Sequence, residues 1–161
     1  ANALGMRVIA TRNSSRDGPD FVDYVGLAHE LNDLAAQADV VLAQLPLTEE
    51  TYKIFNAEFF EIMKPSAYFI NMGRGGHVVN DDLVDALRQH KIAGAALEAL
   101  EPEPLPPGHP LWTLPRVIIT PHVSDYSDKH EDTVWLLYRE NLRRYIAGDK
   151  LLNVIDMKKG Y

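Results

Sequence analysis

The chain has 161 residues, of which 46% are hydrophobic and 9% aromatic, which suits one folded domain and excludes a disordered or fibrous protein. Lys and Arg number 16 against 23 Asp and Glu, and the net charge of −7 argues against a dedicated nucleic-acid or membrane-surface binder. The absence of cysteine excludes disulfides, a thiolate metal site and a cysteine nucleophile. Since no apolar run could span a bilayer and no signal peptide is recognisable, we expect a cytoplasmic globular protein.

Short apolar strands and helices alternate along the first part of the chain. Residues 1–4 predict the last turn of a helix, which Gly5 ends in a left-handed conformation. The elements predicted next are a strand over 6–11, a polar loop over 12–20, a brief strand over 23–26, a helix over 30–38 and a strand over 40–44.

The alternation continues to the C-terminus. Asn56 predicts the cap of a helix that ends before Pro65, and Gly148 ends a long helix predicted from about residue 127. The other predicted elements are strands over 67–72, 93–99 and 117–120 and a helix that begins at Asn80 or Asp81. Apolar strands that alternate with helices indicate an α/β fold with a parallel sheet covered on both faces, and ligands bind at the carboxyl ends of such strands.

The most informative segment covers residues 63–79 and reads MKPSAYFINMGRGGHVV. It places Asn71 at the end of a strand and Arg74 in a turn flanked by glycines, which let a backbone approach a ligand closely. The planar guanidinium of Arg74 suits a carboxylate. From these residues alone, a solvated arginine on a surface turn explains the pattern equally well.

Three segments, in this order, resemble the motifs of the D-isomer-specific 2-hydroxyacid dehydrogenases. They are the segment above, the strand and acidic-proline loop AALEALEPEPL over 95–105, and the histidine loop Thr120-Pro121-His122. Residues 38–51 resemble the family's strand and loop beside the adenosine, and residues 141–154 resemble its closing helix and tail. The resemblance covers nearly the whole chain and implies a doubly wound, Rossmann-like domain that binds a nicotinamide cofactor.

The resemblance also implies three catalytic residues. Arg74 matches the arginine that clamps the substrate carboxylate and polarises its carbonyl. His122 matches the histidine that acts as the acid in reduction and the base in oxidation. Glu103 matches the glutamate that holds the other imidazole nitrogen, and Glu101 is the alternative for this role. The position immediately before the second proline of the loop favours Glu103.

The remaining histidines have no metal-ligand spacing, so we expect no metal site and place them on the surface or in loops. They are His29, His77, His90, His109 and His130.

The segment after the first strand bears on the choice of cofactor. A domain that prefers NAD usually carries an acidic residue there, and this chain has none before Asp17. The run Arg12, Asn13, Ser14, Ser15 and Arg16 suits a 2′-phosphate, so we expect NADP, with NAD and a merely basic surface loop as alternatives. The further cofactor contacts that the resemblance implies are Leu45, Pro46, Thr51, Met72, Gly73, Arg74, Glu98, His122 and Ser124.

The chain departs from the family pattern at three points. Glu98 stands where the family usually has an aspartate, and Asp125 follows Ser124 where the family often has a glycine. No G-x-G-x-x-G loop is present. We therefore interpret residues 1–161 as an incomplete dinucleotide-binding domain that lacks its first strand and glycine loop, with residues 127–161 returning towards a missing substrate domain.

The sequence thus predicts the C-terminal half of a homodimeric, NAD(P)-dependent oxidoreductase that acts on a small 2-oxo acid such as glyoxylate or hydroxypyruvate and is inactive as this chain alone. The alternative is a truncated, non-catalytic dinucleotide-fold module that binds a partner. The strand order 3-2-1-4-5-6 of such folds predicts an open slot between strands 6–11 and 40–44. We expect another polypeptide segment to fill it.

Overall fold

The computed structural model describes residues 1–158, so positions 159–161 of the predicted tail lie outside the described residues. The strands are β1 (Ile9–Arg12), β2 (Tyr24–Leu27), β3 (Val40–Ala43), β4 (Tyr68–Asn71), β5 (Gly94–Leu97) and β6 (Val117–Ile119). The α-helices are α1 (Leu31–Ala35), α2 (Ala57–Ile62), α3 (Asn80–Arg88) and α4 (His130–Ala147). Short 3-10 helices are η1 (Asn2–Leu4), η2 (Ala28–Glu30), η3 (Gly75–His77) and η4 (Pro110–Trp112).

All pairings between these strands are parallel, as the alternation of strands and helices predicts. One sheet has the order β3-β4-β5-β6, and a second contains only β1 and β2. In parallel sheets the carboxyl ends of all strands lie at the same edge, so the loops that follow β3, β4, β5 and β6 are neighbours. These loops carry most of the predicted site residues.

Helix α2 is fixed to the sheet by its cap and by aromatic packing. The Asn56 side chain accepts a hydrogen bond from the Phe59 backbone N–H at 3.1 Å, as predicted for the cap. Phe59 and Phe60 are buried, and the ring of Phe69 in β4 lies 5.3 Å from that of Phe60. Phe55 joins the same cluster, with its ring 5.0 Å from Phe69. This cluster forms the centre of the core and supports β4, which leads to Arg74.

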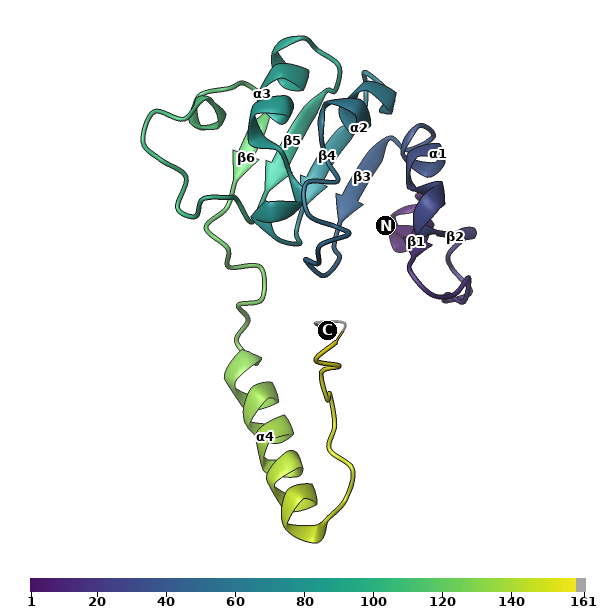
Figure 1. The fold of residues 1–161 in the computed structure, drawn as a ribbon, viewed down its shortest axis with the longest axis vertical. Helices are drawn as coiled ribbons and strands as arrows, with labels where there is room; N and C mark the ends of the chain where they lie inside the picture. The colour runs from purple at the N-terminus through teal and green to yellow at the C-terminus, as the bar shows by residue number, and fades with distance from the viewer. Residues whose placement is uncertain (159–161) are drawn as a thin grey trace.

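Only one face of the four-stranded sheet is covered. Helices α2 and α3 pack on the same face (Figure 1), over buried residues such as Phe69 and Leu97. On the opposite face, Leu42 is 53% exposed and Ile118 is 64% exposed. The expectation of a sheet covered on both faces is therefore wrong for the described residues. The strands are apolar on both faces, but α4 runs away from the sheet and leaves the second face in solvent.

Helix α4 and the tail after it form an arm of their own. No residue of α4 is buried, and the Trp135 side chain is 70% exposed. Gly148 ends the helix in the left-handed conformation, as predicted, and the chain then turns back alongside α4 (Figure 1). The Asn141 side chain holds the tail by bonding both backbone groups of Leu152.

Strands β1 and β3 belong to different sheets and do not pair with each other. Strand β3 is bonded to β4 on one side, and no strand of residues 1–158 is bonded to its other side. An unpaired edge exposes backbone donors and acceptors. In the described part of the chain, no strand joins the two sheets. Within residues 1–158, no helix has both the length and the apolar character needed to cross a membrane.

Candidate active site

The turn after β4 is held by the side chain of Asn71, which is fully buried. Its Oδ1 accepts the Gly73 N–H at 3.1 Å, and its Nδ2 donates to the carbonyl of Arg74 at 3.0 Å. The same Nδ2 donates to the carbonyl of Ala99, in the loop after β5, at 3.3 Å. One amide therefore fixes the shape of the turn and joins it to the neighbouring loop.

Gly75 allows these two loops to touch. A Cβ at this position would lie 2.0 Å from the carbonyl carbon of Leu100, which is backbone and cannot rotate away. Any residue larger than glycine must therefore push the Arg74 turn and the loop after β5 apart.

The guanidinium of Arg74 is available for a ligand. Arg74 is exposed, and its side chain donates to the backbone carbonyl of Gly73 at 3.0 Å. Within residues 1–158 it forms no ion pair with a carboxylate. An arginine without an acidic partner, at the edge of a sheet where ligands bind, suits a carboxylate.

His122 and Glu103 lie in contact. The His122 Nδ1 is 3.0 Å from Oε1 of Glu103 and 3.2 Å from Oε2. Both side chains are about two-fifths exposed, at 39% and 41%. Because Nδ1 faces the carboxylate, Nε2 is left for another partner, which is the arrangement of a histidine that moves a proton. Glu101 does not make this contact within the described chain, so the geometry favours Glu103 of the two.

Glu98 holds the loop that carries His122. Its carboxylate accepts hydrogen bonds from the Thr120 hydroxyl and from the Ser124 backbone N–H, on either side of the histidine. The bond from Thr120 is the main reason that the pKa of Glu98 lies below its usual value. His122 itself has φ 54°, in the left-handed region that few side chains adopt. The buried Glu98 carboxylate thus stabilises a strained loop.

His77 is not a surface or loop residue, contrary to expectation. It ends η3 and is fully buried, with its Nδ1 accepting the Arg74 backbone N–H at 3.0 Å. Burial lowers the pKa of His77 below its usual value. The sequence around His77 has no apolar periodicity that would predict burial of this histidine. Its position three residues after Arg74 is the one sequence signal that fits a hydrogen bond within the turn.

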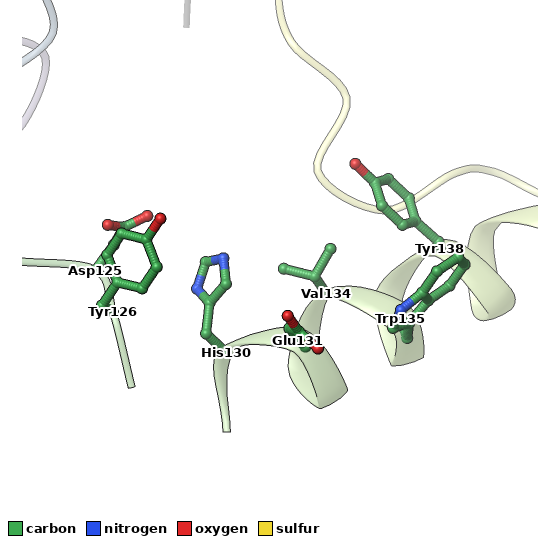
Figure 2. Close-up of a pocket in the computed structure, with 7 residues that line it drawn as sticks. All are labelled: Asp125, Tyr126, His130, Glu131, Val134, Trp135 and Tyr138. Atoms are coloured by element: carbon green, nitrogen blue, oxygen red, sulfur yellow. The ribbon is translucent and has the colours of Figure 1, made fainter. Parts of the chain in front are cut away.

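The other four histidines lie where they were expected. His29 and His90 are exposed, and His109 caps η4 through its ring nitrogen. His130 begins α4, where it lines an open hollow with Asp125, Tyr126 and residues of the helix (Figure 2). Asp125, which departs from the family pattern, lines this hollow. The hollow is on the arm formed by α4, and the candidate site is at the edge of the sheet.

The loop after β3 supplies several of the predicted cofactor contacts. The Thr51 hydroxyl donates to the carbonyl of Pro46 at 2.7 Å and accepts the Thr48 N–H at 2.8 Å. Thr51 thus closes the loop, and Leu45 and Pro46 lie within it. The Met72 N–H donates to the carbonyl of Ala43 at 2.9 Å, which places the start of the Arg74 turn beside this loop.

The two arginines after β1 differ in their partners. The Arg16 guanidinium lies 2.6 Å from Oε2 of Glu30 and also donates to the Tyr24 hydroxyl. Hydrogen bonds from the Leu27 N–H, Tyr24 and Arg16, in that order, lower the pKa of Glu30 to about 2. Arg12 donates to the carbonyl of Asp17, so its charge is not paired with an acid within the described chain. The predicted cradle of Arg12, Asn13, Ser14 and Arg16 therefore contains one engaged and one available guanidinium.

Residues 1–124 match the family model of the D-isomer specific 2-hydroxyacid dehydrogenase, NAD binding domain. A curated relative, the glyoxylate/hydroxypyruvate reductase A of Photorhabdus laumondii, is 40% identical over 134 residues, which are 82% of this chain and 42% of the relative. The chain spans about half the length of the curated relatives that it matches.

Solved structures give the same result. One is a probable 2-hydroxyacid dehydrogenase from Rhizobium etli in complex with NADP, HEPES and L(+)-tartaric acid, with a TM-score of 0.88 and 33% sequence identity. The match covers 99% of this chain and 51% of the Rhizobium chain. Another is an NADPH-dependent glyoxylate/hydroxypyruvate reductase from Sinorhizobium meliloti in complex with NADP and sulfate, with a TM-score of 0.87 and 32% sequence identity. The match covers 99% of this chain and 51% of the Sinorhizobium chain.

The close approach at Gly75 can be tested by adding one methyl group. We expect Gly75→Ala to lower the free energy of unfolding by about 2 kcal/mol or more, since its Cβ would overlap the Leu100 backbone. The control is Gly26→Ala, whose Cβ would meet only side-chain atoms, the nearest at 3.3 Å. Urea denaturation of both variants measures the difference. Equal losses for the two variants would contradict the contact.

Proposed function

This chain belongs to the D-isomer specific 2-hydroxyacid dehydrogenases, and we propose that it forms the greater part of the NAD(P)-binding domain of an enzyme that reduces a small 2-oxo acid. The observation that carries this proposal is the His122–Glu103 pair, together with an arginine, Arg74, that has no acidic partner within the described residues. These residues follow the three adjacent strands β4, β5 and β6.

In the proposed reaction, Arg74 binds the carboxylate of the 2-oxo acid and orients its carbonyl group. His122 donates the proton on Nε2 to the carbonyl oxygen as negative charge develops there, and takes it back in the reverse reaction. Glu103 faces Nδ1, so it keeps the imidazole oriented and stabilises its protonated form. A reduced nicotinamide supplies the hydride when it is bound.

The residues of the site fit such a cofactor. Arg12 offers a guanidinium in the last position of β1, and Arg74 offers another in the turn after β4; neither has an acidic partner within residues 1–158. We propose NADP as the preferred cofactor, in line with the NADP found in the related Rhizobium and Sinorhizobium proteins. The Photorhabdus relative supports glyoxylate or hydroxypyruvate as the substrate. The homodimer and the cytoplasmic location stay predictions.

The catalytic assignment is tested by kinetics on the full-length protein. We expect His122→Ala to lower kcat by about 10²- to 10⁴-fold with glyoxylate and NADPH, because the proton donor is lost. Glu103→Gln keeps a hydrogen-bonding group but removes the charge, so it should lower kcat by a smaller factor. Glu101→Gln is the matched control, with nearly unchanged kcat. A wild-type protein that binds NADPH but reduces no 2-oxo acid would favour the non-catalytic module.

The choice of cofactor is tested at the two arginines. We expect Arg12→Ala to raise KM for NADPH about tenfold or more relative to KM for NADH, since a charged hydrogen bond to the 2′-phosphate is lost. Arg16→Gln is the comparison, and it should change this ratio less because Glu30 already engages Arg16. Initial rates with both cofactors measure the ratio. Equal use of NADPH and NADH by the wild type would show that the basic loop after β1 does not select the cofactor.

We further propose that residues 1–161 are an incomplete domain of a longer protein. The open edge at β3, the uncovered face of the four-stranded sheet and helix α4 then pack against the rest of that protein. Hydrogen exchange followed by mass spectrometry tests this. In the full-length protein, the β3 amides that are not bonded to β4 should exchange at least tenfold more slowly than in residues 1–161 alone. Exchange at Ala86 and Leu87, which lie in α3 on the covered face, is the internal control. Equal rates at β3 in the two proteins would contradict a filled slot.

A further inference from the structure

The imidazole of His77 is buried against the turn that carries Arg74. Its side chain is fully buried, and its backbone carbonyl accepts the Phe55 N–H at 3.0 Å. The Phe55 ring stands edge-on to the imidazole, with 6.4 Å between the ring centroids. The backbone and ring of His77 are thus both fixed by the core.

The ring also packs against the start of the turn. A Cβ on Gly73 would lie 2.8 Å from Nδ1 and Cε1 of the imidazole, so the ring occupies the space that a side chain at residue 73 would need. The contact between glycine and ring brings Nδ1 within 3.0 Å of the Arg74 backbone nitrogen.

The hydrogen bond determines which imidazole nitrogen carries the proton. Nδ1 accepts the Arg74 N–H, so in the neutral ring the proton lies on Nε2. Burial lowers the pKa of His77 and favours the neutral form at pH 7, although backbone carbonyls at Pro46 and Arg74 act in the opposite direction. A protonated Nδ1 would face another donor, so only the neutral ring allows this bond.

Nε2 is the one buried side-chain nitrogen or oxygen of residues 1–158 that has no hydrogen-bond partner. The Pro46 carbonyl interacts with the ring without meeting hydrogen-bond geometry at Nε2. An unpaired buried donor is unfavourable, so an apolar side chain of similar shape would fill this space at lower cost. Filling the core therefore does not account for an imidazole here, whereas the bond from Nδ1 to Arg74 does.

We propose that His77 is a positioning residue for substrate binding, which rests on the proposed function of Arg74. Buried side chains bind both polar backbone groups of Arg74. Asn71 donates a hydrogen bond to the Arg74 carbonyl, and His77 accepts one from the Arg74 N–H. Together these bonds fix the torsion angles from which the guanidinium leaves the turn. His77 thereby sets the direction in which Arg74 presents its guanidinium to a carboxylate.

The experiment compares three substitutions in the full-length protein. In His77→Asn the short amide places its oxygen near the position of Nδ1 and can still accept the Arg74 N–H. His77→Gln reaches the position of Nε2, and His77→Leu has no acceptor. We expect His77→Leu and His77→Gln to raise KM for glyoxylate by about 10- to 100-fold, in line with the loss from a misplaced binding group. Both should change KM for NADPH less than threefold. His77→Asn should keep KM for glyoxylate within about threefold of the wild-type value.

Urea denaturation and NMR separate positioning from folding. We expect His77→Leu to change the free energy of unfolding little, because removal of the unpaired Nε2 donor is offset by loss of the acceptor for the Arg74 N–H. If His77→Leu does not fold, the comparison of His77→Asn with His77→Gln still tests the positioning role. In ¹⁵N-histidine spectra of the wild type at pH 7, His77 should show the neutral tautomer protonated on Nε2.

Equal KM values for glyoxylate in all three variants, or a His77 protonated on Nδ1, would overturn the positioning role. Failure of the proposed function looks different. In that case the wild-type protein would reduce no 2-oxo acid, while the NMR spectrum would still show the bond between His77 and the Arg74 turn.

Discussion

The proposed chemistry depends on one buried amide, the side chain of Asn71, which joins two loops. Its three hydrogen bonds hold the Gly73–Arg74 turn and reach the carbonyl of Ala99 in the loop that leads to Glu103. Each buried polar group that loses its partner costs about 1–3 kcal/mol, so the two loops are held in one arrangement. Gly75 is the steric counterpart of this amide, because it lets the backbones meet without a side chain between them.

Glu98 holds the third loop, which follows β6 and carries His122, in a similar way. Its carboxylate bonds Thr120 and Ser124, on either side of a histidine whose backbone is in the left-handed region. A strained residue persists only where its surroundings hold it. The glutamate that departs from the family pattern thus supports the loop of His122. Buried polar side chains hold all three loops, whereas the groups proposed to meet the substrate are exposed.

Local patterns predicted the elements of the fold well. Asn56 and Gly148 mark helix ends through their own conformations and hydrogen bonds, and the apolar runs before Asn71 and Glu98 mark buried strands. The relative positions of Glu103 and His122 came from the family resemblance, because spacing along the chain does not show which loops meet. Sheet register brings them together through β5 and β6.

The missed features depend on contacts between distant parts of the chain. The ion pair of Arg16 and Glu30 joins residues 14 positions apart, in the segments that follow β1 and β2, and no local rule identifies Glu30 as the partner. Burial of His77 follows from its packing against Phe55 and Gly73. The uncovered sheet face could not be predicted either, because a strand that is apolar on both faces has the same sequence whether or not a helix covers it.

An acidic chain can still bind anions, because the local pairing of charges matters more than the net charge of −7. Glu30 is paired with Arg16, so its negative charge is countered at contact distance. Arg12 and Arg74 bond only backbone carbonyls within the described chain and keep their full charge. At physiological ionic strength, charges more than about 8 Å apart in solvent are largely screened. An approaching carboxylate or phosphate at the edge of the sheet therefore meets the two arginines, and distant surface acids oppose it little.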